Sequence, residues 1–90
     1  MPEDPDIAVA IQYDKDKDNA PRVIAKGMRL KAEKIREIAK EAGVPVMRNV
    51  TLAGALYRVD IGQEVPEELY DAVAEVLNFV FALQQETEKK

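Results

Sequence analysis

The 90-residue sequence contains neither cysteine nor histidine. Without cysteine, the chain has no disulfide framework, no thiolate nucleophile and no zinc site built on sulfur. Without histidine, it lacks the commonest general base and the commonest transition-metal ligand. A carboxylate pair is the remaining catalytic option, but nothing in the spacing of the 17 acidic residues marks two of them. We therefore predict that the protein is not an enzyme and that it holds no metal and no cofactor.

Long hydrophobic runs are also missing. The apolar stretches are far shorter than the ~20 residues of a membrane-spanning helix, and the N-terminus lacks the basic and apolar pattern of a signal sequence. The 13 basic and 17 acidic residues give a net charge of −4, which disfavours binding to a phosphate backbone. We predict a soluble cytoplasmic protein that binds no nucleic acid and does not insert into the membrane.

The composition that is present is that of a folded domain. Hydrophobic residues make up 47% of the chain and charged residues 33%, a balance that disordered segments do not show. We predict one α/β domain over residues 6–85, preceded by a short lead (1–5) and followed by a frayed charged tail (86–90).

Two apolar stretches near the N-terminus predict a β-hairpin. Residues 22–26 form the second, shorter strand. Residues 6–13 form the first strand, because larger and smaller side chains alternate along it with the period of a strand; the larger ones are Ile7, Val9, Ile11 and Tyr13.

The charged turn between these strands resembles a calcium-binding loop at first sight. Asp14, Asp16 and Asp18 match the first three ligand positions of an EF-hand. However, Asn19 and Ala25 stand where that loop requires glycine and a bidentate glutamate. We therefore predict a solvated turn that binds no metal.

Three later segments show the three-and-four spacing of amphipathic helices: 28–42, 50–59 and 66–85. Gly43 and Pro45 end the first of them, and Pro66 begins the last. Residues 44–49 between the first two helices predict a third strand, and a right-handed crossover favours its parallel pairing. The predicted fold is an α/β domain in which a small mixed sheet of about three strands packs with three main helices.

Three stretches resemble one family: "AVAIQYDKDKDNAPRVIAKG", "IREIAKEAGVPVMRN" and "LAGALYRVDIGQEVPEELYDAVAEVL". They are similar to the C-terminal cytoplasmic domain of the FlhB/YscU family, the substrate-specificity switch of flagellar and other type III export machines. The resemblance covers about residues 7–83. It implies a non-enzymatic component that docks on the export apparatus, at the inner face of the membrane, to recognise or switch export substrates. The alternative is a soluble adaptor or decoy that binds export substrates or chaperones away from the membrane gate.

In that family a membrane-embedded portion precedes the domain, which cleaves itself at Asn-Pro-Thr-His just before the first strand of this sequence. The four corresponding positions are occupied here by Glu3, Asp4, Pro5 and Asp6. We therefore expect no self-cleavage. The chain resembles a free-standing version of the downstream cleavage product.

The resemblance also implies that a strand upstream of the cleavage site stays paired after cleavage. If this strand is missing, an exposed strand edge is left that invites pairing by another chain. The expected partner is the upstream fragment of a full-length paralogue, a second copy or another part of this chain. The edge residues are Ile7, Val9 and Ile11.

Finally, the resemblance implies a small apolar patch that recognises early export substrates. The matching positions are Ala20 and Pro21, before the second strand, and Ala74 and Leu77 in the last helix. Leu77 also fits the buried stripe of that helix, so its spacing alone leaves both roles open.

Overall fold

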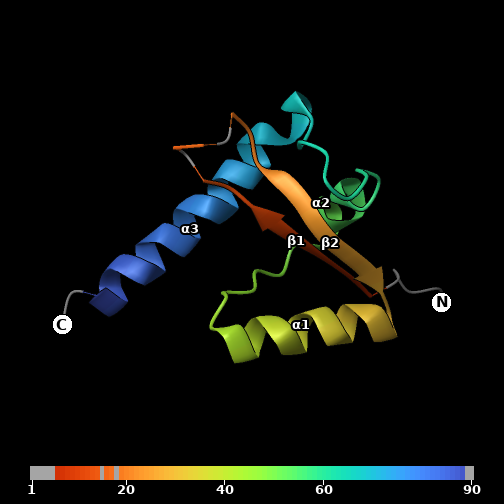
Figure 1. The fold of residues 1–90 in the computed structure, drawn as a ribbon, viewed down its shortest axis with the longest axis horizontal. Helices are drawn as coiled ribbons and strands as arrows, with labels where there is room; N and C mark the ends of the chain where they lie inside the picture. Colours follow the sequence, from red (N-terminus) through yellow and green to blue (C-terminus); the bar gives the residue numbers. More distant parts are fainter. Residues whose placement is uncertain (1–5, 15, 18, 89–90) are drawn as a thin grey trace.

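A computed structural model describes residues 6–14, 16–17 and 19–88. For residues 80–88 it describes the backbone alone. The predicted α/β class with three main helices is confirmed (Figure 1). In chain order the elements are β1 (Ile7–Gln12), β2 (Arg22–Met28), α1 (Leu30–Ala42), α2 (Val50–Leu56), the short 3-10 helix η1 (Glu67–Leu69) and α3 (Tyr70–Glu88).

The two strands form an antiparallel hairpin with one irregularity. Their register shifts between Ala10 and Ile11, which pair with Ala25 and Val23, so Ile24 is an extra residue in β2. Residues that pair across two antiparallel strands lie on the same face of the sheet. One face therefore carries the small residues Ala8, Ala10, Ala25 and Gly27, with the polar pair of Gln12 and Arg22 at its end, whereas the other carries Ile7, Val9, Ile11, Val23, Lys26 and Met28.

Helix α1 packs against the face of small residues. Ala32 is fully buried there, and a Cβ atom built on Gly27 would lie 2.5 Å from the Cβ of Lys31. The helix begins at Leu30 and not at Met28 as predicted, because Met28 still belongs to β2. It ends, as predicted, at a left-handed glycine, Gly43 (φ 75°).

The opposite face of the hairpin covers the hydrophobic core. Val9 and Ile11 pack against a buried cluster that β2, α2 and α3 share. Helices α1 and α2 therefore lie on opposite sides of the hairpin (Figure 1). Helix α2 begins at Asn49, whose Oδ1 accepts a hydrogen bond of 3.0 Å from the backbone N–H of Leu52. The buried cluster consists of Val23, Leu52, Leu56, Val65 and Val73.

The prediction of a third strand at residues 44–49, in parallel pairing, is wrong. This segment has no strand structure: the N–H of Val44 closes α1 by donating to the carbonyl of Ala39, and Pro45 has no N–H to offer. Instead, residues 62–65 lie beside β2. The N–H of Gly62 donates to the carbonyl of Val23 at 2.7 Å, and the N–H of Val23 donates to the carbonyl of Gln63 at 3.1 Å.

The other helix boundaries differ from the predicted ones by a few residues. Helix α2 ends at Leu56 and not at residue 59. The last helix begins with the 3-10 turn η1 after Pro66 and continues to Glu88, a little beyond the predicted end at residue 85.

Candidate docking site

The outer edge of β1 carries backbone groups that do not face β2. The carbonyl of Asp6 accepts a hydrogen bond of 2.7 Å from the N–H of Arg29, so Asp6 directs its backbone toward β2. Alternate residues of an antiparallel strand direct their backbone groups to the same edge. It follows that Ala8 and Ala10 also face β2, whereas Ile7 and Val9 face outward.

Ile11 faces outward as well, on the far side of the bulge. Its partner across the hairpin is Val23, whose own N–H and C=O are engaged by Gln63 and Gly62 on the opposite side of β2. Within residues 6–14, 16–17 and 19–88, the sheet consists of β1 and β2 alone. The structure therefore presents the backbone of Ile7, Val9 and Ile11 along one open edge.

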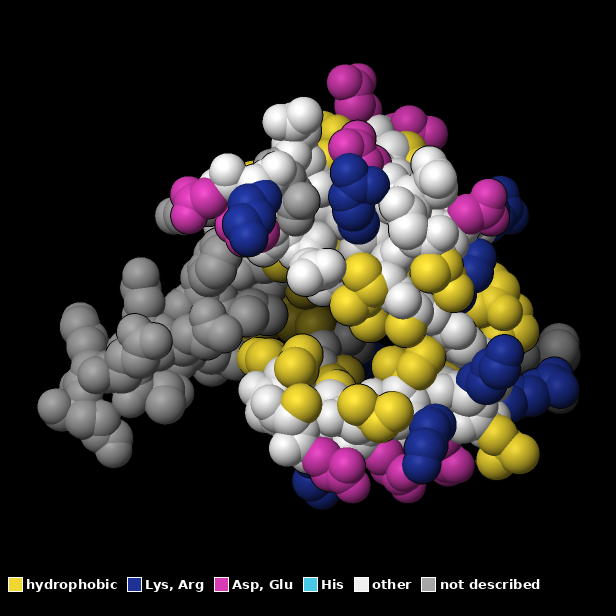
Figure 2. Space-filling model, in the orientation of Figure 1, with side chains coloured by type: hydrophobic (Ala, Val, Ile, Leu, Met, Phe, Trp, Pro, Cys, Tyr) yellow, Lys and Arg dark blue, Asp and Glu magenta, His cyan; other side chains and the backbone are white. Residues whose placement is uncertain are grey.

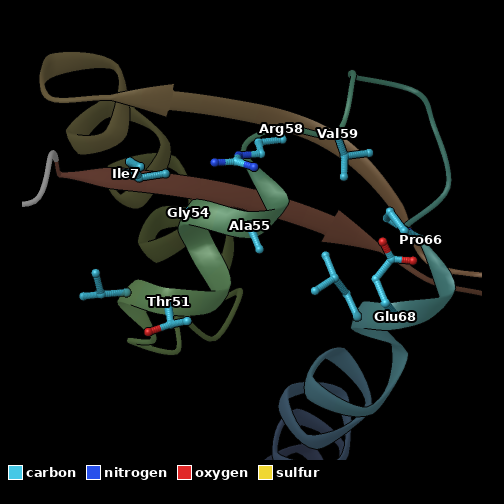
Figure 3. A pocket seen from close by; sticks show the side chains of 10 residues that line it. Ile7, Thr51, Gly54, Ala55, Arg58, Val59, Pro66 and Glu68 are labelled. Carbon is cyan, nitrogen blue, oxygen red and sulfur yellow. The ribbon is translucent and has the colours of Figure 1, made fainter.

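Beside the start of this edge lies a hollow of about 770 Å³. Ile7 of β1 lines it from one side and α2 from another, while Pro66 and Glu68 close it near η1 (Figure 3). Most of its walls are apolar, with Arg58 and Glu68 as the charged members. The hollow gives the side chains of a strand added to the edge a place to pack.

A bidentate ion pair fixes the start of β1 to α1. The two terminal guanidinium nitrogens of Arg36, Nη1 and Nη2, donate to Oδ1 and Oδ2 of the Asp6 carboxylate at 3.0 and 2.7 Å. These hydrogen bonds lower the pKa of Asp6 below its ordinary value of 3.8. Asp6 is the last of the four positions that the resemblance is expected to align with a cleavage motif; Glu3, Asp4 and Pro5 lie outside the described residues.

We expect this ion pair to give the fold an acid-sensitive contribution. A lowered folded-state pKa means that the contribution is present at neutral pH and is lost as the pH falls through that pKa. In an NMR titration of the carboxyl carbons, Arg36→Gln should raise the pKa of Asp6 toward its ordinary value. Arg58→Gln, which removes an arginine just after α2, is the control and should leave the Asp6 titration in place. An unchanged pKa in Arg36→Gln would contradict the pairing.

Lys26 has a structural role that no sequence pattern predicted. Its Nζ donates to the carbonyls of Tyr57 and Val59 at 2.8 and 2.9 Å, and it lies 5.0 Å from the centre of the Tyr57 ring. A cation suits the negative end of a helix, so Lys26 fixes the end of α2 to the hairpin. A lysine inside a strand gives no signal of such a contact 31 residues further along the chain.

The four predicted patch residues differ in accessibility. Ala20 is only 2% exposed, Pro21 and Leu77 are half-buried, and Ala74 is exposed. The carbonyl of Pro21 accepts a hydrogen bond from Val65, a member of the core cluster against which Leu77 packs. Both halves of the predicted patch are thus attached to one core, although Ala20 offers almost no surface.

The charged turn is held by hydrogen bonds within its own backbone and side chains. Asp14 accepts from the N–H of Asp16 through its carboxylate and from the N–H of Lys17 through its carbonyl, both at 3.0 Å. Asp18 lies outside the described residues. Within the described parts of the chain, no three acidic residues gather as metal ligands. No helix in the same parts is long and apolar enough to cross a membrane.

Comparison with known proteins identifies the family. A sequence model described as the FlhB HrpN YscU SpaS family matches residues 4–80. This chain belongs to that family. The predicted resemblance is therefore confirmed.

Two relatives differ in how much of their own length this chain covers. The chain is 52% identical to the flagellar biosynthetic protein FlhB of Escherichia coli (strain K12) over 79 residues, which are 87% of this chain and 21% of FlhB. It therefore spans about a fifth of the length of that relative. It is 41% identical over 83 residues to the uncharacterized protein YlqH of Bacillus subtilis (strain 168), covering 92% of this chain and 89% of YlqH.

Solved structures share the fold. The cytoplasmic domain of FlhB from Shewanella putrefaciens superimposes with a TM-score of 0.87 at 43% identity, over 92% of this chain and 65% of that one. The PscU C-terminal domain superimposes with a TM-score of 0.79 at 36% identity, over 82% of this chain and 95% of the PscU domain. The FlhB match leaves about a third of that cytoplasmic domain without a counterpart here.

Proposed function

We propose that this chain is a non-enzymatic component of a flagellar or type III protein export apparatus. It docks on the apparatus through the outer edge of β1 and takes part in recognising or switching export substrates. Membership of the FlhB family supports this role, as does 48% identity to the hypersensitivity response secretion protein HrcU of Ralstonia nicotianae. The open edge at Ile7, Val9 and Ile11 is the observation that carries the proposal.

The proposed partner is the upstream strand of a full-length family member in the same cell. Unpaired backbone N–H and C=O groups make a strand edge a template for another strand. Pairing supplies main-chain hydrogen bonds, and pockets for alternate side chains supply specificity. The hollow beside Ile7 is such a pocket. In this arrangement the domain stands in for the cleaved part of its relative, on the cytoplasmic side of the membrane.

Self-cleavage forms no part of the proposed role. The family reaction requires an asparagine that cyclises onto its own backbone carbonyl, and Glu3 stands at that position. Asp6, at the position of the histidine, is held by Arg36. Substrate recognition is proposed for the patch of Ala20, Pro21, Ala74 and Leu77, with Pro21 and Ala74 as its accessible members.

An NMR titration with the synthetic upstream strand of a full-length FlhB from the same organism tests the docking. We expect saturable binding, with the largest shifts along β1. Ile7→Pro removes an outward N–H that bonds nothing in β2, and proline is tolerated at strand edges. It should therefore weaken binding by about tenfold or more, since lost main-chain hydrogen bonds carry such affinity, while the fold stays intact. Ile7→Val, which keeps the N–H, should bind like the parent.

The opposite results separate the alternatives. Absence of saturable binding at high micromolar peptide, with the amides of Ile7 and Val9 already protected from exchange, would overturn docking through this edge. Recovery of soluble export substrates or chaperones without any membrane component would favour the adaptor or decoy.

A further inference from the structure

A second, smaller groove lies between β2 and α1, on the side of the hairpin away from the core. Its volume is about 240 Å³. Three branched side chains give it an apolar lining: Ile24 and Ile61 are 48% and 57% exposed, and Ile35 is half-buried. Figure 2 shows hydrophobic side chains gathered between α1 and the part of the molecule above it, with Lys and Arg side chains nearby.

The β-bulge explains why a large apolar side chain is exposed here. Without a partner in β1, Ile24 leaves the alternation that buries Val23 on one face and packs Ala25 on the other. Bulges often re-aim a side chain at the edge of a sheet or next to a functional site. Ile24 is thereby directed beside Ile35 and Ile61 in the wall of the groove.

Every charged residue that lines the groove is a lysine, although the whole chain has a net charge of −4. The Nζ of Lys26 is occupied by the carbonyls of Tyr57 and Val59. Lys31 and Lys34 are exposed. Among the described residues the ion pairs are Arg22–Glu64 and Arg36–Asp6, so neither of these two lysines has an acidic partner there. Three residues apart on α1, they stand on the same side of the helix.

We propose that this groove docks a short amphipathic segment of a partner protein, in which an apolar anchor side chain is flanked by Asp or Glu. The anchor packs on Ile24, Ile35 and Ile61, and the carboxylates pair with Lys31 and Lys34. The groove is smaller than the ~300–1,000 Å³ of typical small-molecule sites, which favours a single anchor over a metabolite. Exposed apolar patches with a polar rim mark protein interaction sites. This surface is separate from the β1 edge, and the inference does not rest on the proposed function.

The experiment uses the ¹⁵N-labelled full chain and three synthetic peptides of equal length. The probe is a helix-forming peptide of Leu and Glu; one comparison peptide has Lys in place of Glu, and the other has Ser in place of Leu. We expect saturable shifts from the Leu/Glu peptide alone, centred on Ile24, Lys31 to Ile35 and Ile61. Binding should weaken as salt is raised, because the pairs are solvent-exposed.

Two pairs of variants separate specific docking from general attraction. Lys31→Glu with Lys34→Glu should weaken binding by about tenfold or more, because like charges then face each other across the contact. The control, Lys17→Glu with Lys40→Glu, has the same net charge and should bind like the parent. Ile61→Ser should weaken binding and leave the rest of the spectrum in place, since this side chain is exposed.

Three results would overturn the proposal. They are equal binding of the Lys and Glu peptides, equal losses in the two double variants, or shifts centred away from the groove. If strand addition at β1 fails while this groove binds its probe, only the proposed function is lost.

Discussion

Gly27→Ala is expected to lower the free energy of unfolding by roughly 2–3 kcal/mol, as overpacking in tight cores does. Gly27 is buried where β2 meets α1. An added Cβ would lie 2.5 Å from the Cβ of Lys31 and 3.2 Å from its carbonyl carbon. Neither atom is the far end of a flexible side chain, so relief requires the whole helix to move. Since α1 packs on small residues along this face, its displacement would open the interface around Ala32.

Gly54→Ala is the matched control in α2. Nothing lies within 4 Å of the Cβ that it would add, and alanine inside a helix is favoured over glycine by ~0.5–1 kcal/mol. We therefore expect Gly54→Ala to stabilise the fold slightly, in urea unfolding monitored by circular dichroism. Equal stabilities of the two variants would contradict the close approach of β2 and α1.

The sequence predicted those parts of the fold that have a regular apolar period. Alternation located β1, and three-and-four spacing located α1, α2 and α3. The third segment beside β2 could not be found in this way. Residues 62–65 contain one apolar side chain, Val65, and their pairing with β2 joins positions about 40 residues apart. Residues 44–49 look more like a strand, but Pro45 and the end of α1 prevent them from forming one.

The same limit applies to the candidate site. Alternation located the strand, but Ile7, Val9 and Ile11 were proposed as edge residues only because the resemblance implies a missing upstream strand. The pairing of Asp6 with Arg36 and the contact of Lys26 with the end of α2 both depend on distant segments meeting. The burial of Ala20 was equally hidden, because its position in a turn suggests exposure. Contacts between elements that are distant in sequence determine these features, so local periodicity cannot predict them.

The open edge depends on the hydrophobic core, because side chains of the edge residues pack into that core and hold the strand in place. Val9 and Ile11 pack against the cluster that contains Leu56. Their backbone therefore stays in an extended line only while that cluster holds the face of the hairpin. Loss of core packing should therefore loosen the extended backbone of the docking edge, even when the edge residues themselves are unchanged.

Leu56→Ala tests this dependence and should lower the free energy of unfolding by ~2–5 kcal/mol, the range for leucine truncations in well-packed cores. Leu56 is 3% exposed at the end of α2, whereas Leu30, the first residue of α1, is 81% exposed. Leu30→Ala is therefore the matched control, expected to change stability by no more than ~0.5 kcal/mol. Hydrogen exchange at Ala8 and Ala10, whose N–H groups face β2, should accelerate in Leu56→Ala and remain as in the parent in Leu30→Ala. If exchange is unchanged although stability falls, the hairpin holds its edge independently of the core, and α2 is not what supports the docking strand.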